Sequence, residues 1–152
     1  MAIKAVFSDK KLKVKVTKLT PNKNHRIIID NLTTGATSAF SSKNKTGLIT
    51  KTVSVDARGV VKTTINPAGE AAMVEYAVGT SEIDCCIAKL VNDAINCTCK
   101  CDKCKEDLKL AETIYLLLQA AVYDATLGLG QSAVDKYNKA KSMCVDNCAC
   151  GC

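Results

Sequence analysis

Apolar and polar residues alternate through much of the first eighty residues of the chain. The run KLKVKVTKL puts three lysines on one side of an extended chain and Leu12, Val14 and Val16 on the other. This period of two is typical of a β-strand with one buried face. Further runs of this kind lie between clusters of Pro, Asn, Asp and Gly: HRIIIDNL, GLITKTVSV, VVKTTIN and EAAMVEYAV. We expect GLITKTVSV and VVKTTIN to form a β-hairpin through residues 56–59.

The period changes at Gly79. After Thr80 and Ser81, apolar residues recur at helical spacing, as Ile83, Cys86, Ile87, Leu90, Val91, Ala94 and Ile95. A second helix is predicted over residues 106–127 and a third near residues 132–145. The short Gly-Leu-Gly connection between them predicts antiparallel neighbours. Residues 114–122 are apolar almost all round, so we expect another subunit to cover this helix.

These patterns predict a segregated α+β fold. Residues 1–79 are expected to form an N-terminal antiparallel β-sandwich, because short alternating strands separated by turns are typical of that architecture. Residues 80–152 are expected to form a three-helix C-terminal region that clustered cysteines staple together.

Charge is divided unevenly between the two parts. Residues 1–80 carry eleven Lys and two Arg against five acidic residues, a net charge of +8, whereas residues 81–152 carry eight Lys against ten acidic residues, a net charge of −2. A basic half can meet nucleic acid or an acidic protein surface. Because the lysines alternate with apolar residues and form no Arg-rich cluster, the sequence favours a solvated strand face, and nucleic acid is not the expected partner.

The sequence holds no apolar run long enough for a membrane span, and its first residues lack the apolar stretch of a secretory signal. We therefore expect no membrane partner and a chain that is made in a reducing cytoplasm.

Cysteines provide the main candidate chemistry. Two clusters contain eight of the ten cysteines: Cys97, Cys99, Cys101 and Cys104, then Cys144, Cys148, Cys150 and Cys152. At about 1.5 Å per helical residue, the antiparallel hairpin leaves Cys144 roughly 13 Å short of Cys104. The remaining eight residues can span more than about 20 Å when extended. The two clusters are therefore predicted to be close in space.

Thiols gathered in a reducing compartment favour a metal over disulfides. Zinc suits them, because four thiolates complete a tetrahedral structural site. We expect these eight cysteines to hold one or two zinc ions, with Lys100, Lys103 and Lys105 offsetting the thiolate charge. Disulfides, free thiols and another metal remain alternatives, although neither common ferredoxin spacing is present.

Other reactive residues have plainer interpretations. Cys85 and Cys86 are expected to be small buried apolar residues outside the main cluster, and His25, beside a turn, is expected at the surface. The sequence contains no phosphate-binding glycine loop, and its single histidine forms no recognisable triad. Zinc bound by four cysteines keeps no open position for water. We therefore expect that the protein is not an enzyme.

The segment EIDCCIAKLVNDAINCTCKCDKCKEDLKLAETIYLLLQAA, with the cysteines that follow it, resembles small cysteine-rich virion structural proteins of crAss-like tailed bacteriophages. The resemblance implies a virion component that is made in the host bacterial cytoplasm. It also implies partners among copies of the chain and other virion proteins, such as the portal or neighbouring ring proteins.

We accordingly expect a structural virion protein, and specifically a subunit of a head–tail connector, as a neck ring or adaptor. A capsid auxiliary protein and a cytoplasmic zinc-binding adaptor or regulator are the alternatives. A nucleic-acid binder ranks behind them, because only the basic half of the chain supports it.

Overall fold

The computed structural model describes residues 2–8, 11–54, 58–67, 71–96 and 103–146. Within these residues the chain forms seven strands followed by three helices: β1 (Ala2–Ser8), β2 (Lys11–Thr17), β3 (Asn24–Asn31), β4 (Thr37–Lys43), β5 (Ile49–Ser54), β6 (Gly59–Pro67), β7 (Met73–Gly79), α1 (Ser81–Ile95), α2 (Lys103–Thr126) and α3 (Gly130–Asp146). The predicted segregated α+β fold is confirmed.

The strands form two antiparallel sheets, with orders β1-β2-β5 and β4-β3-β6-β7. The alternation on β2 is confirmed, because Leu12, Val14 and Val16 are all fully buried between the sheets. They pack with apolar residues of the facing sheet, including Ile27, Ile29, Val61 and Ile65. On one side of the sandwich the Lys51 ammonium lies 4.2 Å from the centre of the Phe40 ring, which links β5 to β4.

The predicted hairpin between β5 and β6 is wrong. Strand β5 pairs with β2, whereas β6 pairs with β3 and β7 in the other sheet. The chain therefore crosses from one sheet to the other between these strands. The side chain of Asn31 fastens the crossing, because its Nδ2 donates to the Arg58 carbonyl at 2.9 Å while its Oδ1 accepts from the backbone of Thr33 and Thr34.

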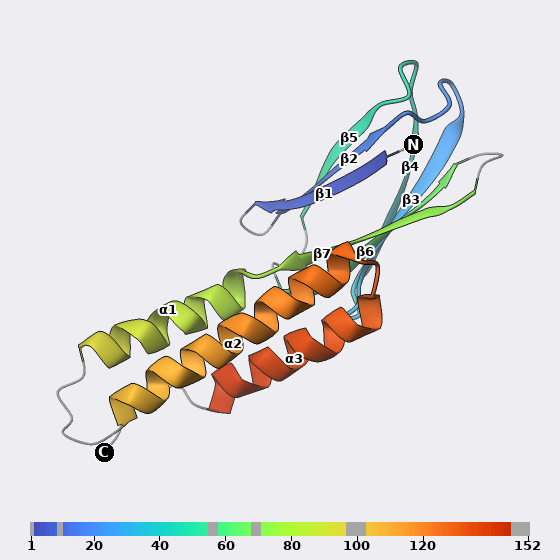
Figure 1. Cartoon of the computed structure of the whole chain (residues 1–152). Coiled ribbons are helices and arrows are strands. Elements are labelled where there is room, and N and C mark those ends of the chain that lie inside the picture. Colours follow the sequence, from blue (N-terminus) through green and yellow to red (C-terminus); the bar gives the residue numbers. More distant parts are fainter. Residues whose placement is uncertain (1, 9–10, 55–57, 68–70, 97–102, 147–152) are drawn as a thin grey trace.

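Strand β6 takes part in two hydrophobic cores. Val61 faces the interior of the sandwich, and its neighbour Val60 faces the helices. Tyr76 and Val78 of β7 also pack against the helical core. Although β7 ends at Gly79 and α1 begins at Ser81, the helices are therefore built onto the β6–β7 end of the sandwich rather than hung from a linker (Figure 1).

The three helices lie side by side, with α2 between α1 and α3 and antiparallel to both (Figure 1). The antiparallel pairing of α2 and α3 confirms the prediction, although both helices begin a few residues earlier than expected. Gly128 ends α2 in the left-handed conformation, with φ of 77°. Gly130 begins α3 against the Tyr76 ring, where a Cβ atom would clash, and this close approach fixes the hairpin to β7.

Candidate functional site

Helix α2 buries one face and exposes another that is also apolar. Its buried residues include Ala111, Ile114, Leu118, Ala121 and Ala125. On the other side, the side chains of Leu108, Tyr115, Leu116 and Tyr123 are exposed by 48%, 49%, 59% and 63% of their area. We call these four residues the α2 stripe. Large apolar side chains gathered in this way are typical of interaction surfaces rather than of a free surface.

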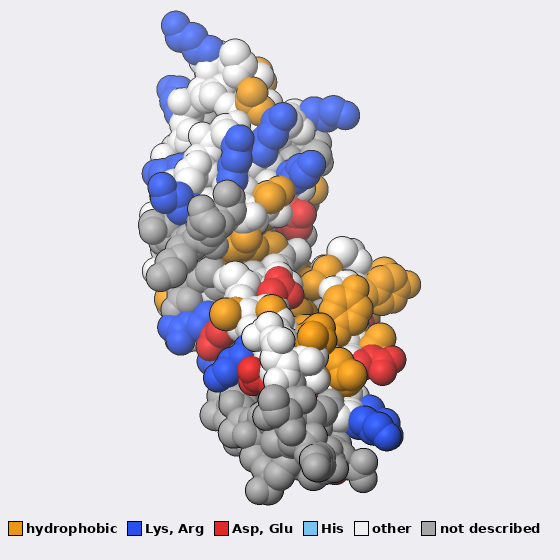
Figure 2. Space-filling model, turned by 90° about the vertical axis from the view of Figure 1, so that its left-hand side faces the viewer, with side chains coloured by type: hydrophobic (Ala, Val, Ile, Leu, Met, Phe, Trp, Pro, Cys, Tyr) orange, Lys and Arg blue, Asp and Glu red, His pale blue; other side chains and the backbone are white. Residues whose placement is uncertain are grey.

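The spacing of the α2 stripe suits contact with another helix. Steps of seven residues separate Leu108 from Tyr115 and Leu116 from Tyr123, so all four side chains fall within an arc of about 100°. Leu127 and Leu129, each about half exposed, extend the apolar surface into the turn after α2. Figure 2 shows this gathering of hydrophobic side chains on one side of the helical part, beside acidic and basic groups.

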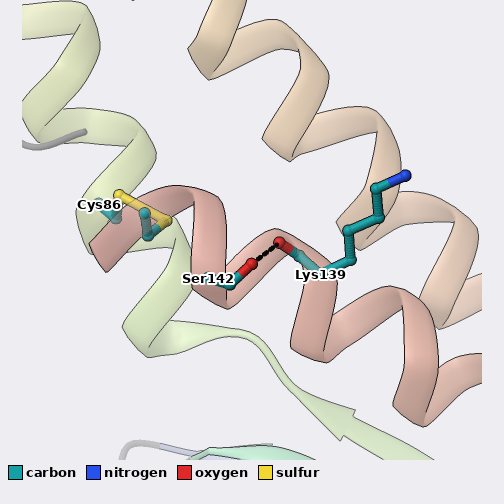
Figure 3. Close-up of a disulfide and its surroundings, with 4 residues drawn as sticks. Cys86, Lys139 and Ser142 are labelled. Atoms are coloured by element: carbon teal, nitrogen blue, oxygen red, sulfur yellow. Dashed lines mark hydrogen bonds between the residues drawn. A yellow bond between two sulfur atoms is a disulfide. The ribbon is translucent and has the colours of Figure 1, made fainter. Parts of the chain in front are cut away.

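A second feature joins α1 to α3. Cys86 of α1 and Cys144 of α3 form a disulfide across 58 positions of sequence, with their Cα atoms 6.0 Å apart (Figure 3). That separation lies within the usual range for disulfides. Met143 and Ile87 pack on the same core beside it. The bond therefore ties the end of α3 to the first half of α1.

The pairing differs from what the sequence analysis expected of these two residues. Cys86 was expected outside the cluster and Cys144 within it, yet the structure brings their sulfur atoms together. Cys104 lies in the first turn of α2, but its side chain is outside the described residues, as are Cys97, Cys99, Cys101, Cys148, Cys150 and Cys152. Within the described part of the chain, no three His, Cys, Asp or Glu residues gather to hold a metal ion. Zinc binding therefore stays a prediction.

Two other expectations are wrong. Cys85 is exposed and carries a free thiol rather than lying buried. His25 is buried, with only 2% of its surface exposed, and its Nε2 donates a hydrogen bond to the Thr20 carbonyl at 3.1 Å. The histidine therefore supports the turn between β2 and β3 from inside.

A groove of about 520 Å³ lies between the sandwich and the helices, lined by parts of β1, β7, the start of α1 and the end of α2. Glu75 stands on its wall. Burial raises the pKa of Glu75 above its ordinary value, while a hydrogen bond from the Ala5 backbone N–H and the charge of Lys4 act in the opposite direction. The described lining contains neither histidine nor cysteine, so it brings together no Ser–His or Cys–His pair.

Comparisons with protein-family models, with curated proteins and with solved structures found no match to this chain. Among the described residues, no helix is both long enough and apolar enough to cross a membrane.

Sequence reasoning identified the apolar helix but missed the disulfide. The all-round apolar run at residues 114–122 was the signal for a second apolar face on α2, and the α2 stripe is that face. Cys86 lies on the apolar stripe of α1 and Cys144 near the end of α3. A local sequence pattern does not show which helices are neighbours, or which of their residues lie at the same level along the bundle. The pairing became visible only with the packing of the bundle.

Proposed function

We propose that this protein is a structural subunit that assembles with copies of itself through the α2 stripe. The observation that carries the proposal is the set of four large apolar side chains left exposed on a helix whose opposite face is already buried in the core. Burial of such side chains is favourable by about 25 cal/mol per Å² of apolar surface removed from water.

A second copy is the partner that the stripe itself favours. Glu112 and Gln119 are exposed on the same side of α2 as the stripe. Apolar anchors mixed with a few polar groups at near-heptad spacing are typical of helices that pack against an equivalent helix. An isologous contact of this kind needs no other surface to be complementary.

The particle in which this assembly would serve comes from the sequence resemblance. On that basis we propose a virion protein of a tailed phage, made in the host bacterial cytoplasm, and most simply a neck ring or adaptor of the head–tail connector. Portal or neighbouring ring proteins are then its partners. A capsid auxiliary protein would use the same stripe, and a zinc-binding adaptor would present it to a different protein.

Zinc remains our proposed structural metal for the cysteine clusters. The end of α1, the start of α2 and the end of α3 lie at the same end of the bundle (Figure 1). While Cys144 is bonded to Cys86, it cannot also be a thiolate ligand, so seven of the eight cluster cysteines remain. Seven thiols suffice for one site of four cysteines but not for two separate ones.

The assembly proposal is tested with the double variant L108E/L116E. Two carboxylates in the stripe would have to lose water on contact, so we expect the wild-type chain to form an oligomer and the variant to run as a monomer. Size-exclusion chromatography with light scattering over a concentration series measures the mass. The same measurement is repeated after the protein is mixed with candidate ring partners. This covers the case in which the chain forms an oligomer only when its partner is present.

The matched control is L32E/L48E, which places the same substitutions on leucines of the sandwich that are 39% and 41% exposed. This variant should assemble like the wild type. A wild-type chain that stays monomeric with and without partners would overturn the proposal, as would equal loss of assembly in both variants.

A further inference from the structure

The outer face of the three-stranded sheet carries a group of exposed lysines. Lys4 of β1 and Lys11, Lys13 and Lys15 of β2 are all exposed, and the residues between them on β2 point into the core. We call these four residues the lysine face. Figure 2 shows basic side chains spread over the sandwich part, while acidic side chains gather mainly around the helices.

The register of the sheet places like charges together on this face. Lys4 lies directly opposite Lys15, and Lys13 lies between Val6 and Thr52. Strands β1, β2 and β5 contain no Asp or Glu, so no acidic residue of the sheet itself separates the lysines. Glu75, on the neighbouring sheet, is close enough for its charge to interact with that of Lys4. Like charges directly opposite each other on paired strands destabilise a sheet.

The residue types of the lysine face indicate which class of partner it suits. Protein interfaces are depleted in lysine and have an apolar centre, whereas here Val6 is the single large apolar side chain that the described residues expose among the lysines. Lysine and threonine side chains are common contacts to phosphate oxygens, and Thr50 and Thr52 flank the lysines on β5. Lysines on alternate residues of β2 stand about 6.8 Å apart, in a straight row of point charges.

We propose that the lysine face binds the phosphate backbone of nucleic acid without reading its sequence. The sequence alone favoured a solvated strand face for these residues, because they alternate with apolar residues and form no Arg-rich cluster. Alternation along one strand does not show which lysines of different strands meet. The sheet places Lys4 beside the row on β2, and its three strands contribute no acidic residue to this face. This binding does not depend on assembly through the α2 stripe.

The test measures the affinity of the whole chain for a fluorescein-labelled DNA duplex of arbitrary sequence as salt increases. Four lysine–phosphate contacts predict a slope of about −3.6 for log K against log salt. Between about 50 mM and about 200 mM salt, the affinity should therefore fall roughly 150-fold. A second duplex of unrelated sequence should bind equally well.

The double variant K13Q/K15Q removes two of the contacts. Its slope should be about −1.8, so the same increase in salt should weaken binding only about twelvefold. The control K89Q/K139Q removes the same charge from exposed lysines of α1 and α3. The control should keep the wild-type slope.

Three outcomes would overturn the proposal. The first is no duplex binding at about 50 mM salt, and the second is an equal loss of slope in K13Q/K15Q and K89Q/K139Q, which would assign the effect to net charge. The third is binding to phosphatidylserine vesicles without binding to DNA, which would assign the face to a lipid surface.

Discussion

Asp124 lies near the end of α2, where its carboxylate accepts hydrogen bonds from two side chains of α3. The Lys136 ammonium donates to Oδ2 at 2.6 Å, and the Ser132 hydroxyl donates to the same atom at 2.6 Å. The backbone carbonyl of Asp124 also accepts from the N–H of Leu129 in the turn. One residue therefore joins the end of α2 to the first turns of α3. The hydrogen bond from Lys136, then that from Ser132, lowers the pKa of Asp124 below its ordinary value.

Replacement of Asp124 by Asn should lower the melting temperature at neutral pH. A carboxyl whose pKa is lower in the folded than in the unfolded state stabilises the fold above its unfolded value, and this contribution disappears as pH falls through the folded value. The gap in melting temperature between wild type and D124N should therefore be constant near neutrality and close below about pH 4. Thermal melts across this pH range measure it, and a gap that does not depend on pH would contradict the assigned contacts.

Single residues were the least predictable level of this molecule. His25 follows a turn and was expected at the surface, but the hydrogen bond to the Thr20 carbonyl holds its ring inside. Cys85 adjoins the apolar stripe of α1, yet α2 and α3 cover only part of that helix and leave its thiol exposed. In both cases the neighbouring element determines whether the side chain is buried, and the local sequence pattern does not show which element that is.

The helices and strands themselves were predicted better than which strands pair with each other. The period of two on β2 and the period of three to four on α1 arise from which side of each element is buried, so the sequence records them directly. The pairing of β5 with β2 instead depends on the chain crossing between sheets, and the Asp-Ala-Arg-Gly signal for a hairpin does not exclude such a crossing. Asn31, which fastens that crossing to β3, carries no sequence signal of this role.

The disulfide between α1 and α3 should stabilise the helical part. A bond across 58 positions of sequence contributes about 2–4 kcal/mol, chiefly by restricting the unfolded chain. For a chain of this length, reduction of the bond should lower the melting temperature by roughly 5–15 °C. Thermal melts with and without reductant measure this effect. Native mass spectrometry of the oxidised chain should show a mass lowered by the two hydrogen atoms lost when the bond forms and raised by one zinc ion.

The double variant C86S/C144S is the control for this prediction. It should melt near the temperature of the reduced wild type and respond little to reductant, because the bond is already absent. If reductant lowered the melting temperature of the variant as much as that of the wild type, another group would be responsible and the pairing of Cys86 with Cys144 would not matter in solution.

The whole molecule combines two cores through one hairpin. Val61 belongs to the core of the sandwich and Val60 to that of the helices. Because β6 and β7 contact both parts, they fix the position of the helices relative to the sandwich. The class of the fold followed from the change of period at Gly79, but the covering of the sandwich end by the helices did not, because it depends on contacts such as Gly130 against Tyr76.

At this scale the molecule presents two different surfaces. The lysine face lies on the outer sheet of the sandwich, and the α2 stripe lies on the helical part. The first is charged and carries almost no apolar side chains, and the second is apolar with few charges. A subunit that binds copies of itself by one part and a polyanion by the other can do both at once, because the surfaces do not overlap.

Hydroxyl-radical footprinting read by mass spectrometry tests most directly whether the α2 stripe is buried on assembly. Tyr115 and Tyr123 report from within the stripe, and fully buried Tyr137 is the internal reference. We predict that both stripe tyrosines are protected nearly as well as Tyr137 in the assembled wild type and become reactive in L108E/L116E. Equal and high reactivity of Tyr115 and Tyr123 in both proteins would contradict assembly through α2.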